Sequence, residues 1–210
     1  MEITSIQKYK GTTYEVELDN ERKIYLHAEI IADFSLYSGQ TIERDELRRV
    51  IYASNFRRAY QFALYRLDYR DYSFSEMLKT LEKTYKNEKL CLAVAEKLVK
   101  IGAIDDARYA EKLARRFVES RKFGYRRAKR EIILKGIGEY LAEDALEPYR
   151  ECFEENLMHL LETKHARYLT DENDRKSIEK VKNALVRYGY GFDEINRAVK
   201  EYFENSADYQ

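Results

Sequence analysis

The sequence predicts a mainly α-helical protein, in which three tandem three-helix repeats form an elongated curved array behind a small N-terminal module containing a β-hairpin. One Pro and eight Gly in 210 residues amount to about 4%, against roughly 12% in average proteins, which disfavours folds with many tight turns. From residue 55 onward, apolar side chains recur at helical spacing. When the second helices of the three repeats are aligned, Leu81, Ile132 and Leu185 occupy the same position, 51 and 53 residues apart. A period near 50 residues indicates a helical repeat protein.

The N-terminal module covers residues 1–54. Alternating apolar and polar side chains predict strands at residues 3–6, 14–18 and 23–27. The turn-forming sequence Asp19-Asn20-Glu21 lies between the last two and predicts their hairpin connection. Apolar residues at helical spacing then predict a short helix over residues 43–52, before the repeats begin.

Local signals at helix ends define the three repeats, which we place at residues 55–104, 105–149 and 150–210. Ser73 and Glu76 form a capping-box pattern at the start of the second helix. Asp105 is a favourable N-cap for the first helix of the second repeat. Gly136 and Gly189 follow the second helices of the last two repeats, where glycine is the preferred residue to end a helix.

The formal net charge is zero, from 38 Lys and Arg against 38 Asp and Glu, but the charges are unevenly distributed. Residues 1–107 carry 17 basic and 18 acidic side chains, residues 108–135 carry 11 and 3, and residues 136–210 carry 10 and 17. The middle segment therefore has a net charge of +8 and the last segment −7. This concentration of positive charge indicates a polyanionic partner, although a solvated helix face balanced by its neighbours gives the same pattern.

The basic residues of the middle segment are the candidate binding surface. On the first helix of the second repeat they follow i, i+4, i+7 and i+8 spacing, which places them on one face. Arginine outnumbers lysine, which favours bidentate contacts with phosphate or carboxylate. The candidate residues are Arg108, Lys112, Arg115, Arg116, Arg121, Lys122, Arg126, Arg127, Lys129, Arg130 and Lys135. The neighbouring Phe123 and Tyr125 have rings able to stack on bases, but packing inside the protein is the favoured role.

The sequence contains no constellation typical of an enzyme, so we expect neither catalytic residues nor a cofactor. Histidine occurs at His27, His159 and His165, without the i, i+4 spacing of a helical zinc site, and no bound metal is expected. Phosphate-binding glycine loops and the serine nucleophile motif are missing from the sequence. The pair Asp105-Asp106 also has the composition of a metal-binding pair, but helix capping is favoured.

The sequence predicts a protein of the reducing cytoplasm without a membrane segment. No run of 18 apolar residues occurs, and the first residues do not resemble a secretory signal. The two cysteines, Cys91 and Cys152, lie in helical patterns and do not indicate a disulfide framework. Cys91 is expected in the core, and the protein is expected to be a monomer.

Several motifs in the repeats resemble those of the RecX family of regulatory proteins. Residues 104–110, Ile-Asp-Asp-Ala-Arg-Tyr-Ala, match its hallmark of an aliphatic residue, two Asp, any residue, Arg, an aromatic residue and Ala. Lys122-Phe123-Gly124, Arg126-Arg127 and Lys135-Gly136-Ile137 follow at the spacing of the second repeat. The first-repeat pattern is matched at Leu67, Arg70, Ser73, Glu76 and Leu81. The resemblance covers residues 55–205, and the front module is similar to the extension of Gram-positive members.

The resemblance implies a cytoplasmic, non-catalytic regulator that binds the RecA–DNA filament and affects DNA repair and the SOS response. Such a regulator is expected to inhibit strand exchange, ATP hydrolysis and repressor cleavage by RecA. The basic surface then faces DNA, single- or double-stranded, or acidic patches of the filament. Changing Arg126, Arg127 and Arg130 to Glu is accordingly expected to abolish inhibition without unfolding the chain.

Four alternatives stay open. One is a helical-repeat scaffold that binds only proteins, and another is a DNA-binding protein without sequence specificity or a role in RecA regulation. A nuclease built on acidic groups and a transcription regulator are less favoured, the latter because the sequence lacks a base-reading motif.

Overall fold

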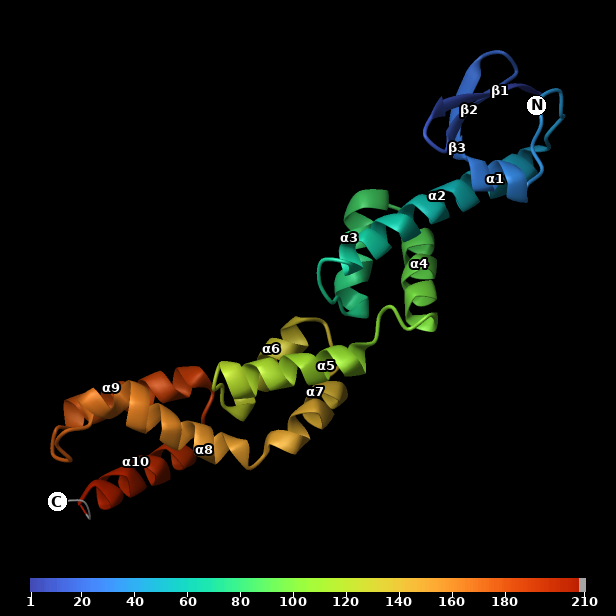
Figure 1. Cartoon of the computed structure of the whole chain (residues 1–210). Helices are drawn as coiled ribbons and strands as arrows, with labels where there is room; N and C mark the ends of the chain where they lie inside the picture. The colour runs from blue at the N-terminus through green and yellow to red at the C-terminus, as the bar shows by residue number, and fades with distance from the viewer. Residues whose placement is uncertain (208–210) are drawn as a thin grey trace. The chain divides into compact units, whose positions relative to one another are not determined.

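The computed structural model describes residues 1–207, and the chain is mainly helical with one small sheet at its N-terminus (Figure 1). The chain divides into two compact units, which are described separately. The first contains residues 1–70 and 78–100, and the second contains residues 71–77 and the described residues from 101 onward.

The sheet consists of three antiparallel strands in the order β1-β2-β3. They are β1 (Ile3–Lys10), β2 (Thr13–Leu18) and β3 (Arg22–His27). Asp19 and Asn20 connect β2 to β3 with φ values of 51° and 58°, and the Glu21 amide donates to the Leu18 carbonyl at 3.1 Å. Asp and Asn tolerate this left-handed backbone better than other non-glycine residues, and the predicted hairpin and third strand are confirmed.

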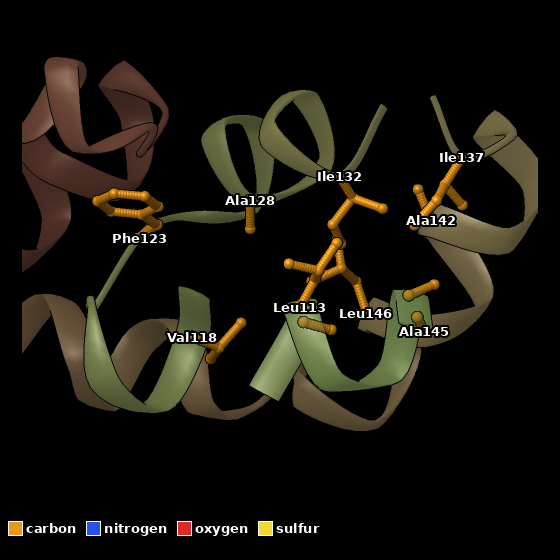
Figure 2. Close-up of a cluster of buried hydrophobic side chains, with 11 residues drawn as sticks. Leu113, Val118, Phe123, Ala128, Ile132, Ile137, Ala142, Ala145 and Leu146 are labelled. Atoms are coloured by element: carbon orange, nitrogen blue, oxygen red, sulfur yellow. The ribbon is translucent and has the colours of Figure 1, made fainter. Parts of the chain in front are cut away.

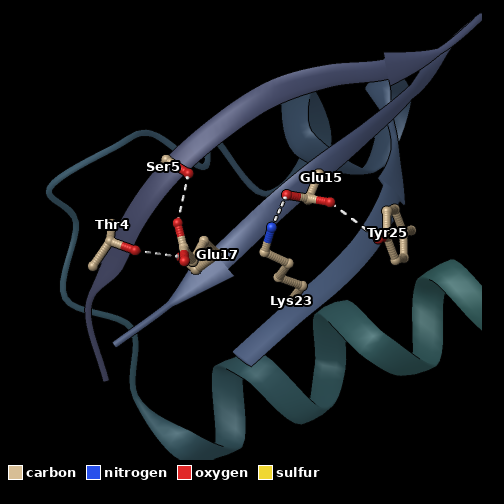
Figure 3. Close-up of polar contacts among 6 residues, drawn as sticks. All are labelled: Thr4, Ser5, Glu15, Glu17, Lys23 and Tyr25. Carbon is tan, nitrogen blue, oxygen red and sulfur yellow. Dashed lines mark hydrogen bonds and ion pairs between the residues drawn. The ribbon is translucent and has the colours of Figure 1, made fainter. Parts of the chain in front are cut away.

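Polar contacts link the strands on one face of the sheet (Figure 3). Glu15 accepts hydrogen bonds from the Lys23 ammonium at 2.7 Å and the Tyr25 hydroxyl at 3.0 Å. The bond from Lys23 is the main reason that the pKa of Glu15 is lowered. Ser5 donates to the Glu17 carboxylate at 3.2 Å.

The other face of the sheet is apolar and is covered by the short helix α1 (Ala28–Asp33) and the first half of α2 (Arg44–Leu67). Its buried core combines residues of the strands with residues of both helices. They include Ile3, Val16, Leu18, Leu26, Ile30, Leu47 and Val50. Burial of these side chains stabilises the module, since each contributes about 1.5–3 kcal/mol relative to an exposed position.

The helix predicted at residues 43–52 is longer in the structure, because α2 continues without a break to Leu67. Nothing in the sequence ends it, and its aromatic side chains continue at i, i+4 spacing. The ring centroids of Tyr52 and Phe56 lie 6.4 Å apart, and those of Phe56 and Tyr60 lie 6.3 Å apart. The expectation of a separate short helix is therefore wrong. Helix α2 supports the sheet with its first half and belongs to the first repeat with its second half.

Helices α3 (Phe74–Tyr85) and α4 (Glu88–Lys100) complete the first repeat. The predicted capping box is present, since the Ser73 hydroxyl accepts from the Glu76 amide at 3.1 Å and the Glu76 carboxylate accepts from the Ser73 amide at 3.5 Å. Cys91 is fully buried in α4, as expected.

The second and third repeats belong to the second unit. They contain α5 (Asp106–Arg115), α6 (Tyr125–Leu134), α7 (Glu139–Leu146), α8 (Cys152–His159), α9 (Arg175–Tyr188) and α10 (Phe192–Ala207). In the core of the second repeat, Leu113 of α5, Ile132 of α6 and Leu146 of α7 converge (Figure 2). Because the apolar sides of α5 and α6 are buried in this cluster, their basic residues lie on the opposite sides.

Candidate functional site

The two aspartates at the start of the second repeat cap different helices. Asp105 accepts a hydrogen bond from the Arg108 amide at 3.0 Å and caps α5. Asp106 accepts from the amide of Phe74 at 2.8 Å, so it holds the first residue of α3. Burial raises the pKa of Asp106, and the bond from Phe74 partly opposes that shift. Within residues 1–207, no cluster of acidic, histidine or cysteine side chains has the arrangement of a metal site.

The end of α6 is held against the start of α3 by a close backbone approach. The Ser73 hydroxyl donates to the Lys135 carbonyl at 2.5 Å. Gly136 follows with a φ of 79°, which confirms its role in ending the helix. A Cβ atom on Gly136 would lie only 2.7 Å from Cβ of Ser75, so the space here admits no side chain.

The start of α6 makes a similar approach to the end of α9. The Gly124 amide donates to the Tyr188 carbonyl at 2.8 Å, and a Cβ on Gly124 would lie 2.6 Å from the carbonyl carbon of Gly189. The buried Tyr190 hydroxyl donates to the Lys122 carbonyl at 3.0 Å, and burial raises the pKa of Tyr190. Both ends of α6 are therefore fixed by direct contacts with other residues of the second unit.

Arg127 takes part in the joint between α6 and α9. Its guanidinium donates to the Arg187 carbonyl at 2.8 Å and lies 3.9 Å from the centroid of the Phe123 ring. Its Nε atom is 3.7 Å from the Glu131 carboxylate. The guanidinium thus provides a hydrogen-bond donor to a carbonyl at the end of α9 and packs against an aromatic ring, so Arg127 has a structural role in the joint.

Three of the four lysines of the basic segment, Lys112, Lys129 and Lys135, are paired with carboxylates. Lys112 lies 3.0 Å from Asp71. Lys129 lies 2.6 Å from both Glu139 and Glu143, and these hydrogen bonds raise the pKa of its ammonium. Through these pairs Lys129 holds the first half of α7 beside α6.

Two further basic residues have carboxylate neighbours. Lys135 lies 3.7 Å from Glu76, and Arg115 donates to Glu119 one turn later in the chain at 3.1 Å. Asp71 lies 41 residues before Lys112 and Glu76 lies 59 residues before Lys135, so sequence patterns did not identify them as partners.

The remaining arginines are solvent-exposed and are the part of the predicted surface open to a ligand. They are Arg108, Arg116, Arg121, Arg126 and Arg130. Arg108 donates to the Gly102 carbonyl at 3.2 Å, and Arg130 is 3.9 Å from Glu131. Across the described part of the chain, Arg116, Arg121, Arg126 and the half-buried Lys122 form no ion pair. We call the five arginines the exposed arginine set.

The aromatic residues near this set differ in accessibility. Phe123 is buried, with its ring centroid 5.7 Å from that of Phe117, which confirms its expected place inside the protein. Tyr125 is partly exposed, and its ring meets Phe153 edge-on at 5.9 Å. Both rings therefore have partners within the second unit.

Comparisons with known proteins agree on one family. Residues 105–146 match a family model described as RecX, second three-helix domain. The chain is 29% identical to regulatory protein RecX of Clostridium acetobutylicum, over 97% of both chains. It is 25% identical to regulatory protein RecX of Clostridioides difficile, over 95% of this chain and 94% of the relative.

Solved structures show the same similarity. The crystal structure of RecX from Lactobacillus salivarius matches with a TM-score of 0.65 and 28% identity, over 71% of this chain and 97% of that one. A second crystal structure, of regulatory protein RecX, shares the fold with a TM-score of 0.75 and 23% identity, over 95% and 98%. Among the described helices, none has the length and apolar composition needed to cross a bilayer. The chain therefore contains a match to the second three-helix domain of the RecX family, and it is similar over nearly its whole length to regulatory proteins named RecX.

Proposed function

We propose that this protein binds the filament that the RecA recombinase forms on DNA, and that it inhibits the recombinase, ATPase and coprotease activities of RecA. It acts by binding, without catalysis of its own, as a cytoplasmic monomer. The single observation that carries the proposal is the exposed arginine set, two of whose members, Arg126 and Arg130, lie on a helix held in place at both ends.

The arrangement of the basic residues supports contact with phosphate. The lysines are largely used to hold helices together, whereas the exposed arginines keep their donors available to a partner. Guanidinium groups bind phosphate oxygens with two parallel hydrogen bonds. Like charges on neighbouring turns repel each other, and a polyanion removes that cost when it binds. DNA within the filament provides such a polyanion.

Measurement of RecA ATPase activity on single-stranded DNA tests the function. The protein is added at several ratios below one per RecA protomer, and ATP hydrolysis is followed at fixed salt. We expect hydrolysis to fall at substoichiometric ratios, because one bound regulator affects neighbouring protomers. Unchanged hydrolysis at equimolar protein would contradict the proposal.

A second candidate is a DNA-binding protein that acts independently of RecA, and the exposed arginine set favours it as well. The two are separated by measuring affinity for bare single-stranded DNA and for the RecA filament under the same conditions. Tighter binding to the filament supports regulation of RecA. Equal affinity for both supports the DNA-binding alternative.

A further inference from the structure

Large apolar side chains are exposed where α6 ends and α7 begins. Leu134 is 72% exposed, Tyr140 is 76% exposed and Ile133 is 38% exposed. We call these three residues the α6–α7 corner. Single exposed apolar residues are ordinary on protein surfaces, but a group of them marks a site of interaction.

The repeats themselves show that the fold does not require apolar residues here. Two positions after the buried Leu81, Ile132 and Leu185, the second helices carry Lys83, Leu134 and Arg187. At the second residue of each third helix, the repeats carry Lys89, Tyr140 and Asp193. The first and third repeats thus have charged, exposed residues at both positions, and only the second repeat has apolar ones.

The corner is continuous with the exposed arginines. Arg126, Arg130 and Leu134 lie one turn apart on α6, so they form one row along the helix. Lys129 fixes the first half of α7 through its bonds to Glu139 and Glu143 at 2.6 Å. The row and Tyr140 are therefore held on a rigid pair of helices, which lowers the entropic cost of binding.

We propose that the α6–α7 corner docks on a protein surface, namely an apolar pocket of the RecA protomer bordered by carboxylates. This inference rests on the proposed function. An aliphatic leucine has no ring to stack on a base and no donor for a phosphate, whereas leucine and tyrosine beside arginine have the composition of a protein–protein contact. A second copy of this chain is a poor occupant, because symmetric pairing of two corners brings Arg126 and Arg130 of both copies together.

The test compares Leu134→Gln/Tyr140→Gln with Leu92→Gln/Val99→Gln. The control removes two apolar side chains of α4 that are 41% and 45% exposed. Affinity for the RecA filament and for bare single-stranded DNA is measured for both variants and for the wild type. Thermal unfolding verifies that all three are folded.

We expect the corner variant to bind the filament about tenfold or more weakly, the loss that follows removal of a central interface contact. Its affinity for bare DNA and the behaviour of the control should stay within about twofold of the wild type, because neither change removes a phosphate contact.

Three outcomes would overturn the proposal. They are a filament affinity equal to that of the wild type, a DNA affinity that falls in parallel with the filament affinity, and a wild-type dimer in sedimentation that the variant lacks. The second outcome assigns the corner to DNA, and the third to another copy of the chain. If the wild type itself does not bind the filament, the proposed function fails instead.

Discussion

The backbone amide of Gly124 donates a hydrogen bond to the carbonyl of Tyr188 at 2.8 Å, which joins the start of α6 to the end of α9. The Ser73 hydroxyl makes the corresponding bond to the Lys135 carbonyl at 2.5 Å, which joins the start of α3 to the end of α6. In both joints, a glycine with positive φ, Gly189 or Gly136, directly follows the residue whose carbonyl accepts the hydrogen bond. The same type of joint therefore fixes both ends of the helix that carries Arg126 and Arg130.

Replacing Gly124 with Ala tests the first joint. The added methyl group overlaps the Gly189 backbone, so we expect the free energy of unfolding to fall by about 2 kcal/mol or more. Gly138→Ala is the matched control, because a Cβ there meets no atom within 4 Å, and its expected cost is below about 1 kcal/mol. Urea unfolding measures both, and equal effects would show that the close approach is unimportant.

Asp106 is predicted to stabilise the joint between α3 and α5 as a hydrogen-bond acceptor. Asp106→Ala leaves the amide of Phe74 without its acceptor, which we expect to cost about 1–2 kcal/mol of unfolding free energy. Asp106→Asn keeps an acceptor oxygen and removes the half-buried charge, so its stability should remain close to that of the wild type. Thermal unfolding compares the two. A large loss in the Asn variant would indicate that the charge itself is needed.

His165 is predicted to make stability depend on pH. It is buried, and its Nε2 atom has no hydrogen-bond partner among the described residues. Burial, with the charges of Lys164 and Arg167, lowers the pKa of the imidazole below 6.5. The unfolded chain therefore binds the proton more readily, and stability is lost as the pH falls through about 6.5.

Urea unfolding at pH 7.5 and 5.5 measures this dependence. The wild type should lose more stability between the two values than His165→Gln does. His159→Gln removes an exposed histidine from the same segment and serves as the control. A His165→Gln variant with the pH dependence of the wild type would rule out the assignment.

The paired and exposed basic residues should differ in their contribution to DNA binding. Arg126→Gln is expected to weaken binding to single-stranded DNA and to make the log–log salt dependence shallower by about 0.7, because it removes one phosphate contact. Lys129→Gln should change affinity by less than about twofold, since Lys129 is committed to two carboxylates and surface pairs contribute at most about 1 kcal/mol. A fluorescence titration at several salt concentrations measures both. If the two variants showed the same salt dependence of DNA binding, the distinction between exposed and paired basic residues would be wrong.

The parts of the fold that sequence predicted correctly depend on local chemistry. The capping box of Ser73, the N-cap Asp105 and the helix ends at Gly136 and Gly189 each involve residues within a few positions of one another. The three strands also follow from local alternation. The predicted end of this helix at residue 52 was wrong, because nothing in the sequence ends the helix there and its aromatic side chains continue at i, i+4 spacing.

The candidate site depended more on contacts between distant residues. Sequence located the basic segment, but it did not separate Lys112 and Arg127, which have partners in the fold, from Arg126, which is exposed. Asp71 lies 41 residues from Lys112, and no periodicity links them. The exposure of Leu134 was also not evident, because a leucine at the end of an amphipathic helix usually faces the core.

The role of the exposed arginines is tested most directly by inhibition of the RecA ATPase on single-stranded DNA. The informative variant is Arg126→Glu/Arg130→Glu, which leaves Arg127 in its joint. Lys176→Glu/Lys180→Glu makes the same change in charge at the same spacing on α9 and is the control. We expect the arginine variant to need about tenfold or more protein for half-inhibition and the control to match the wild type. Wild-type inhibition by a folded arginine variant would contradict the account.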